Sequence, residues 1–178
     1  MNEGLISRRY ATALLKFAQE RGAADAVYEK MKLFEQNYIA HPDLHKALMN
    51  PVLSLRDKEL LLSTAVGIEP GDIYIRGIRL LLKNHREAYV RSICLMYQQI
   101  YRKAYHIVRV SVSTATDMDD EVLGRIKTLV GRVTSDKIEF DHRIDPSVIG
   151  GFILKVDSVQ LDSSISRELK DLRLKFRS

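Results

Sequence analysis

The sequence predicts an α+β protein, in which an N-terminal six-helix bundle is followed by a small C-terminal α+β domain. Apolar residues recur with the 3.6-residue period of helices as far as residue 104. Beyond residue 106 they alternate with the two-residue period of half-buried strands. A chain of 178 residues is long enough for two small domains. We therefore expect a helical domain at residues 1–105 and an α+β domain at residues 106–178.

The first predicted helix is apolar on more than one face. One stripe follows the helical i, i+4, i+7, i+8, i+11 spacing and consists of Ile6, Tyr10, Ala13, Leu14 and Phe17. A second apolar face carries Ala11, Leu15 and Ala18. Because a single bundle covers only one side of a helix, the other side is expected to meet a partner.

Five further helices complete the predicted bundle, separated by breaks at Pro42, Pro51 and Pro70. The second carries Val27, Met31, Phe34 and Tyr38, and DLHKALM forms the third. Ser54 and Asp57 resemble a capping box, which predicts a fourth helix from residue 55 to about residue 65. Asp72 is expected to cap a fifth helix containing Ile75, Ile78, Leu81 and Leu82, and the sixth runs from residue 89 to residue 104.

The C-terminal part predicts the order β-α-β-β-β-α. HIVRVSVST and KIEFDHRI alternate as strands, with DDEVLGRIKTLVGRV as the helix between them. GFILKV and SVQLD form two short strands around a hairpin turn at residues 157–158. SISRELKDLRLKF closes the chain as a helix whose inward residues are Ile165, Leu169, Leu172 and Phe176. Alternation of this kind describes a small α+β domain.

The adjacent glycines Gly150 and Gly151 raise the question of a phosphate-binding loop. Neither the Walker pattern GxxxxGK nor the dinucleotide pattern GxGxxG is present, and the glycines are followed by apolar residues. Glycine within a strand pattern more often marks a bulge or a close backbone approach. The pair is therefore interpreted as a structural device of the α+β domain.

No residue pattern indicates an active site or a metal site. His41 and His45 are four apart, but Pro42 interrupts the helix that a zinc-binding pair requires. Asp141 and His142 are neighbours on a strand and so point to opposite faces. The single cysteine, Cys94, lies in an apolar helical pattern and is expected to be buried and inert. We therefore expect no catalysis, no cofactor and no metal.

The net charge of +5 lies entirely in the first part of the chain. Residues 1–105 hold 16 Lys and Arg against 11 Asp and Glu, whereas the remaining residues hold 12 of each. A basic run over residues 79–103 has tyrosines interleaved with it, a composition found in single-strand binders. An RNA-binding adaptor that uses this run is therefore the alternative hypothesis for the function of the chain. The structural interpretation is that most of these tyrosines lie in the core and that the cations form a solvated helix face.

The sequence also bears on membranes and targeting. It contains no apolar run near the roughly 20 residues that span a bilayer. Its N-terminus lacks the apolar core of a secretory signal and the features of a presequence. These features predict a protein of a cytoplasm-like compartment.

Two segments resemble one known family. SRRYATALLKFA, residues 7–18, resembles the first helix of the delta subunit of bacterial F-type ATP synthase, whose family includes the mitochondrial oligomycin-sensitivity-conferring protein. HRIDPSVIGGFILKVDSVQLDSSISRELKDLR, residues 142–173, is similar to the signature of that family, in which Asp145, Gly150 and Gly151 occupy the fixed positions. Length and domain order match as well.

The sequence departs from the family pattern at two turns. Val156-Asp157-Ser158 stands where the family commonly has a glycine in the hairpin. Asp162-Ser163-Ser164 replaces the Asp-Gly-Ser that usually precedes the last helix. Because Ser and Asp tolerate turns, the resemblance still implies the same fold.

The resemblance implies a non-catalytic stator subunit that joins the catalytic head of the ATP synthase to its peripheral stalk and resists rotational torque. In the family, the helical domain binds the N-terminal helices of the alpha subunits, and the α+β domain holds the b subunits of the stalk. The bacterial branch implies the cytoplasmic face of the inner membrane, reached only through the complex, with one copy per complex and no nucleic acid.

The family binds the alpha-subunit helices in a groove between its first and fifth helices. For this chain, the resemblance implies a groove lined by Tyr10, Ala13, Leu14, Phe17, Ile75, Ile78, Leu81 and Leu82. The helical spacing leaves open which of the eight face the bundle core instead. For the stalk, the resemblance points to the strand at residues 150–156 and the last helix.

Overall fold

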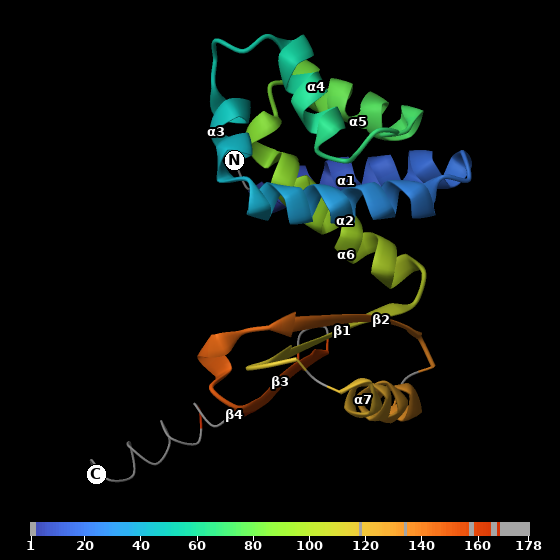
Figure 1. Cartoon of the computed structure of the whole chain (residues 1–178). Coiled ribbons are helices and arrows are strands. Elements are labelled where there is room, and N and C mark those ends of the chain that lie inside the picture. The colour runs from blue at the N-terminus through green and yellow to red at the C-terminus, as the bar shows by residue number, and fades with distance from the viewer. Residues whose placement is uncertain (1–2, 118, 134, 157–158, 165–166, 168–178) are drawn as a thin grey trace. The chain divides into compact units, whose positions relative to one another are not determined.

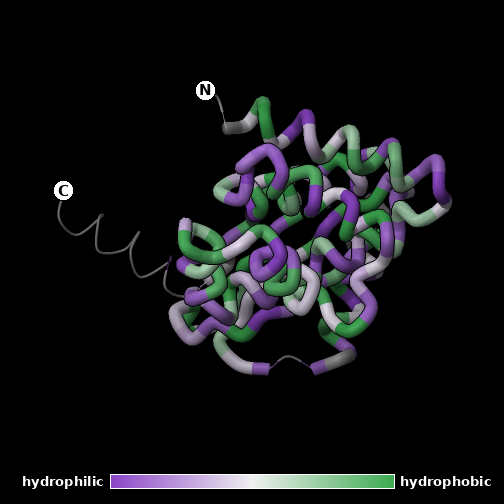
Figure 2. Tube along the Cα trace, turned by 90° about the horizontal axis from the view of Figure 1, so that it is seen from above, coloured by the Kyte–Doolittle hydropathy of each residue, from purple (hydrophilic) through white to green (hydrophobic). Residues whose placement is uncertain are grey.

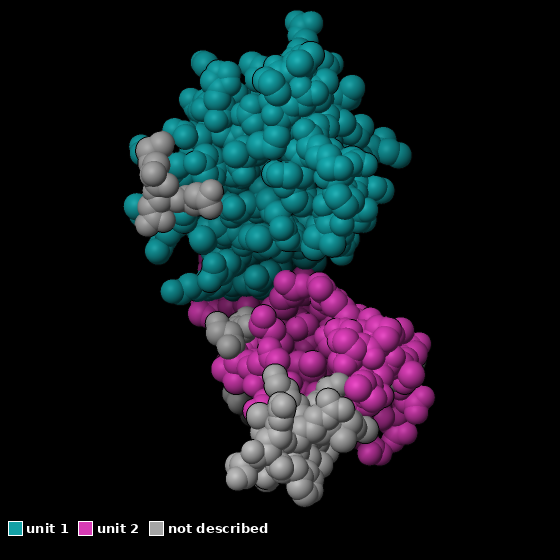
Figure 3. All heavy atoms as spheres, turned by 90° about the vertical axis from the view of Figure 1, so that its left-hand side faces the viewer, with its two compact units in different colours: residues 1–103 teal, residues 104–178 magenta. Residues whose placement is uncertain are grey.

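The structure is a computed structural model, and it describes residues 3–117, 119–133, 135–156, 159–164 and 167. The chain forms two compact units, Met1–Lys103 and Ala104–Ser178. Figure 1 shows the elements of each unit, and Figure 3 colours the two units separately. Each unit is described by itself.

The first unit contains the six predicted helices. Their bounds are α1 Glu3–Glu20, α2 Ala24–Ala40, α3 Pro42–Met49, α4 Leu55–Thr64, α5 Asp72–Lys83 and α6 Val90–Ala104, with a short 3₁₀ helix, η1 Glu87–Tyr89, before α6. The helical bundle predicted from the apolar period is therefore confirmed.

Two helix starts show how the local sequence sets the element bounds. The capping box before α4 is confirmed, because the Asp57 amide donates to Ser54 Oγ at 3.2 Å and the Ser54 amide donates back to the Asp57 carboxylate. The expectation that Asp72 caps α5 is wrong, because Gly71 is the N-cap and Asp72 is the first helical residue. There its carboxylate accepts from Arg76 at 2.8 Å, one turn along the helix.

The core of the helical unit is built on α6 and α2. Tyr97, Cys94 and Phe34 are buried, and the rings of Tyr28 and Tyr101 stack with centroids 4.1 Å apart. Hydrophilic and hydrophobic residues are interspersed along the trace (Figure 2). Within the described residues, no helix has both the length and the apolar character needed to cross a bilayer.

One ion pair is buried in this unit. Lys58 on α4 donates to Glu87 Oε1 on η1 at 2.7 Å, and the two side chains are 6% and 15% exposed. Burial by itself raises the pKa of the Glu87 carboxyl, but the hydrogen bond and the charge of Lys58 outweigh it, so the pKa is lowered. The pair therefore ties α4 to the chain segment that enters α6.

The second unit contains a four-stranded mixed sheet. Its elements are β1 Ile107–Thr114, α7 Asp120–Val133, β2 Lys137–Ile144, the 3₁₀ helix η2 Pro146–Val148, β3 Gly151–Val156 and β4 Val159–Ser164. The strand order is β2-β1-β3-β4, with β1 and β2 parallel and the other pairs antiparallel. Since parallel neighbours need a crossover, α7 supplies the connection between β1 and β2 (Figure 1).

The sheet has one apolar face and one polar face. Val110 and Val112 of β1 are buried and share their face with Phe140 of β2, over which Lys127 of α7 lies 5.0 Å from the ring centroid. On the other face, Asp141 accepts from Arg109 at 3.1 Å. The alternation of HIVRVSVST and KIEFDHRI thus gives the predicted strands. The predicted last helix and the turn at residues 157–158 lie outside the described residues.

The glycine pair sits where η2 turns into β3. Asp145 accepts from the Ser147 amide at 2.9 Å, and hydrogen bonding from the Ser147 side chain and amide lowers the pKa of the Asp145 carboxyl. Gly150 then donates to Val148 O at 2.7 Å, and Gly151 begins β3 with φ of 76°. A side chain at Gly151 would be strained, because L-residues rarely adopt a positive φ. The glycines are a turn device rather than a phosphate loop.

Gly151→Val is expected to destabilise the C-terminal unit by about 1–3 kcal/mol, because a β-branched residue is forced to a positive φ. Hydrogen exchange of the full chain measures this through the β1 and β3 amides, while the α2 and α6 amides keep their protection. Gly124→Ala on α7, where an added Cβ meets nothing within 4 Å, is the control. Equal loss of protection in both units would contradict the expectation that the C-terminal unit unfolds independently of the helical unit.

Lys58→Met is expected to destabilise the chain by about 3 kcal/mol at neutral pH, because it leaves the Glu87 carboxylate buried without its cation. The lowered pKa of Glu87 means that the pair stabilises the wild type above the ordinary pKa of 4.5 and stops doing so as the pH falls through the lowered value. The free energy of unfolding of the wild type and of Lys58→Met is measured with urea at pH 7 and pH 4. The difference between the two proteins should be smaller at pH 4. Lys46→Met is the control, since its pair with Asp43 is exposed and should change stability by less than about 1 kcal/mol. A pH-independent cost would contradict this account.

Candidate functional site

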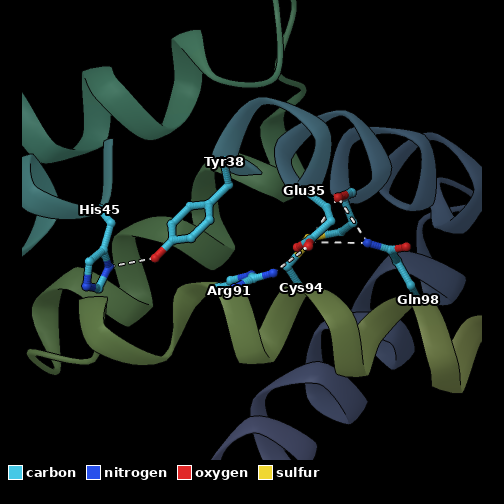
Figure 4. Close-up of polar contacts among 7 residues, drawn as sticks. Glu35, Tyr38, His45, Arg91, Cys94 and Gln98 are labelled. Carbon is cyan, nitrogen blue, oxygen red and sulfur yellow. Dashed lines mark hydrogen bonds and ion pairs between the residues drawn. The ribbon is translucent and has the colours of Figure 1, made fainter. Parts of the chain in front are cut away.

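The histidines and acids that the structure describes do not assemble a reactive cluster. His45 shares a 2.6 Å hydrogen bond with the Tyr38 hydroxyl (Figure 4). On β2, His142 bonds Thr114 Oγ1 at 2.8 Å, whereas Asp141 pairs with Arg109 on the other face of the sheet. Among the residues that the structure describes, no three His, Cys, Asp or Glu side chains are grouped so as to hold a metal ion.

Cys94 is part of the packing between α2 and α6. Its Sγ donates to Met31 O at 2.9 Å, and Gln98 Nε2 donates to the same carbonyl at 3.2 Å (Figure 4). Burial raises the pKa of the Cys94 thiol to about 12. Because the thiolate is the reactive form, this cysteine is inert at neutral pH, as expected from its sequence context.

The basic run at residues 79–103 is largely engaged in contacts of the bundle itself. Arg79 pairs with Glu59 at 2.8 Å, and Arg91 pairs with Glu35 at 3.1 Å. Arg102 contacts the Tyr28 hydroxyl. Three of the tyrosines at residues 74–105, Tyr74, Tyr97 and Tyr101, are buried. These contacts favour the structural interpretation of the run over single-strand binding, which uses exposed aromatic rings.

Helix α1 buries one face and leaves the neighbouring stripe accessible. Ser7, Ala11, Leu15 and Ala18 are buried. The predicted groove residues of this helix lie on the adjacent stripe: Tyr10, Leu14 and Phe17 are half-buried, and Ala13 is exposed. The apolar surface that they present is available to a partner.

The predicted groove residues of α5 are less accessible. Ile78, Leu81 and Leu82 are buried, with exposures of 3%, 6% and 2%, and only Ile75 is half-buried. The three buried side chains therefore support α5 from the core side in the isolated chain.

Helices α1 and α5 meet at a glycine. A Cβ added at Gly77 would lie 3.0 Å from Leu14 Cδ1, closer than ordinary van der Waals contact. We call the line on which Leu14 meets Gly77 the α1–α5 seam. Phe17 and Ile73, one turn farther along each helix, line the same cavity. The two helices are thus antiparallel along the seam (Figure 1).

Sequence reasoning missed three residues of α5 near this seam. Ile73 and Gly77 are half-buried, and Leu80 is 51% exposed. A signal was present, because glycine inside a helix costs roughly 0.5–1 kcal/mol relative to alanine and so calls for a packing reason. The close approach of Leu14 supplies that reason.

Comparisons with known proteins agree with this architecture. Residues 6–176 match the family described as ATP synthase delta (OSCP) subunit. ATP synthase subunit delta of Bacteroides thetaiotaomicron is 37% identical over 178 residues, covering 99% of this chain and 96% of the relative. The same subunit of Lactobacillus acidophilus is 31% identical, covering 94% of this chain and 92% of the relative.

A solved structure shows the same fold. A chain of the Toxoplasma gondii mitochondrial ATP synthase hexamer superposes with a TM-score of 0.69 at 17% identity, covering all of this chain and 98% of that one. The helical bundle followed by the small mixed sheet is therefore a fold found within an ATP synthase. The chain belongs to the ATP synthase delta (OSCP) subunit family and is a non-catalytic stator subunit of the ATP synthase, associated with the membrane through that complex.

Proposed function

We propose that the helical unit, residues 1–103, seats the N-terminal helices of the alpha subunits along the α1–α5 seam, and that the C-terminal unit, residues 104–178, holds the b subunits of the peripheral stalk. The subunit then works in one copy per complex at the cytoplasmic face of the bacterial inner membrane. It acts by mechanical connection, without cofactor, metal or nucleic acid. The observation that carries the proposal is the accessible apolar stripe of α1 beside the close α1–α5 contact.

The accessible stripe fits the apolar face of a helix. Tyr10, Leu14 and Phe17 recur at intervals of four and three residues, so they line one side of α1 over two turns. Half-buried side chains of this kind pack partly on the bundle and still offer apolar area, as interface anchors do. An amphipathic helix laid along them buries its own apolar stripe, which is the helix-in-groove mode of recognition.

The eight predicted groove residues then have two roles. Tyr10, Ala13, Leu14, Phe17 and Ile75 retain exposed surface for direct contact. Ile78, Leu81 and Leu82 hold α5 in place beneath the surface. Because packed interiors transmit changes in shape, substitution of the buried three would alter the seat indirectly.

Support for a stalk contact in the C-terminal unit lies in the edge of its sheet. β4 Val159–Ser164 is an edge strand, and Val159 and Leu161 are 72% and 55% exposed. These residues share the apolar face of the sheet with Leu154 and Val156 of β3. The strand at residues 150–156, together with this edge, is the candidate surface for the b subunits.

The charge distribution supports steering of the partner. The +5 net charge of residues 1–105 would attract acidic partner segments over a distance of about 8–10 Å at physiological salt. Association should therefore be faster at low ionic strength than at high ionic strength.

Titration calorimetry of the full chain with a synthetic peptide of the first ~20 residues of the cognate alpha subunit, about five helical turns, tests the seat directly. We expect saturable 1:1 binding, weakened about tenfold by Leu14→Ala or Tyr10→Ala, because each removes an apolar anchor. Leu60→Ala on α4, a 64% exposed leucine, is the matched control. Absence of binding by the folded wild type, or equal weakening by the control, would argue against this seat.

Gly77→Ala tests the seam without removing any side chain. The added methyl group meets Leu14 at about 3.0 Å, so Leu14 must move, and it can move because it is half-buried. We expect the thermal midpoint to stay equal or rise, since alanine favours the helix by up to about 1 kcal/mol. Affinity for the peptide should fall several-fold. Unchanged affinity would show that the Leu14–Gly77 contact does not shape the seat.

A further inference from the structure

A cavity of about 550 Å³ opens where three elements of the helical unit converge. Its walls come from the end of α1, the first two turns of α2, and the loop at residues 69–71 with the first turn of α5. The lining is mainly apolar and includes Phe17, Val27, Pro70, Ile73 and Tyr74. A site of this size and character is suited to a ligand with a bulky apolar part.

The volume of the cavity matches one turn of an α-helix. A helix with side chains is about 10–12 Å wide and rises 5.4 Å per turn, so one turn occupies roughly 420–610 Å³. The measured volume of about 550 Å³ falls in this range. The cavity is therefore comparable in size to one turn of a helix.

The cavity continues the α1–α5 seam. Leu14 meets Gly77 on the seam, and Phe17 and Ile73, which lie on the adjoining turn of each antiparallel helix, are in the cavity wall. A helix that lies on the accessible stripe of Tyr10, Leu14 and Phe17 thus meets the cavity at Phe17, which belongs to both.

The charges around the cavity favour a peptide over a phosphate or a metal ion. Arg21 lies over the Phe17 ring at 5.6 Å, and Lys30 donates to Val66 O at 3.2 Å. Glu69 also lines the cavity, as does Asp72, which is held by Arg76. Because both signs are present, the site does not concentrate the charge that an anion or a divalent cation requires.

We infer that this cavity is the terminal seat of the helix that binds the α1–α5 seam, and that it receives one end turn of that helix, with a large apolar side chain against Phe17 and Ile73. This inference rests on the proposed function and deepens it. It extends the binding surface onto α2 and the loop at residues 69–71. The end turn seated in the cavity then fixes the position of the partner helix along the α1–α5 seam.

Ala26→Leu tests the inference, because Ala26 lies in the cavity wall and is exposed, so the larger side chain fills the space without removing a contact. Ala40→Leu, the same change at the exposed far end of α2, is the control. The full chain is titrated with three alpha-subunit peptides: the N-terminal ~20 residues, and two versions that each lack one helical turn at one end. Ala23→Leu, in the same wall, serves as a second filling variant if Ala26→Leu lowers the thermal midpoint.

We expect Ala26→Leu to weaken binding of the full peptide about tenfold and to have no effect on one of the two shortened peptides, whose missing turn identifies the seated end. Ala40→Leu should match the wild type with all three. Equal affinity of Ala26→Leu and wild type for the full peptide, or a loss that persists with both shortened peptides, would overturn the inference and leave the proposed seam intact. Failure of the wild type to bind the full peptide would remove the proposed function, and the inference with it.

Discussion

The helical unit depends on the hydrogen bonds that polar side chains of α6 make with the backbone of α2. Tyr97 donates to Ala24 O at 3.2 Å, and Cys94 and Gln98 both donate to Met31 O. A buried polar group without a partner costs about 1–3 kcal/mol, so these three hydrogen bonds favour the observed register of α2 on α6. The stacked rings of Tyr28 and Tyr101 reinforce that register.

The packing of α2 on α6 also determines which face of α1 stays accessible. With α2 held on α6, the short turn after α1 brings the buried face of α1, with Ala11 and Ala18, against the bundle. Small residues there permit a close approach, and Gly77 permits another on the side of α5. The stripe with Leu14 and Phe17 is then only half covered. An accessible apolar surface is thus a consequence of how the core closes, and it is available for a permanent partner.

The buried polar groups of the helical unit serve the packing of its helices. The Lys58–Glu87 pair ties α4 to η1, and the Cys94 thiol ties α6 to α2. A subunit that resists torque needs rigid elements and large apolar contacts, because such contacts are not lost when salt screens surface charges. The chain forms two compact units, and the proposed function assigns a different partner to each.

The sequence alone determined the helix and strand periods, the capping box at Ser54, the change of period near residue 105 and the family, because these depend on local spacing and on motifs. Only the tertiary structure decided which apolar residues face inward. α5 is apolar on two sides, so spacing could not show that Ile78, Leu81 and Leu82 are buried. The Leu14–Gly77 contact and the Lys58–Glu87 pair join residues 63 and 29 positions apart. Such contacts arise from the packing of whole helices, which local periodicity does not encode.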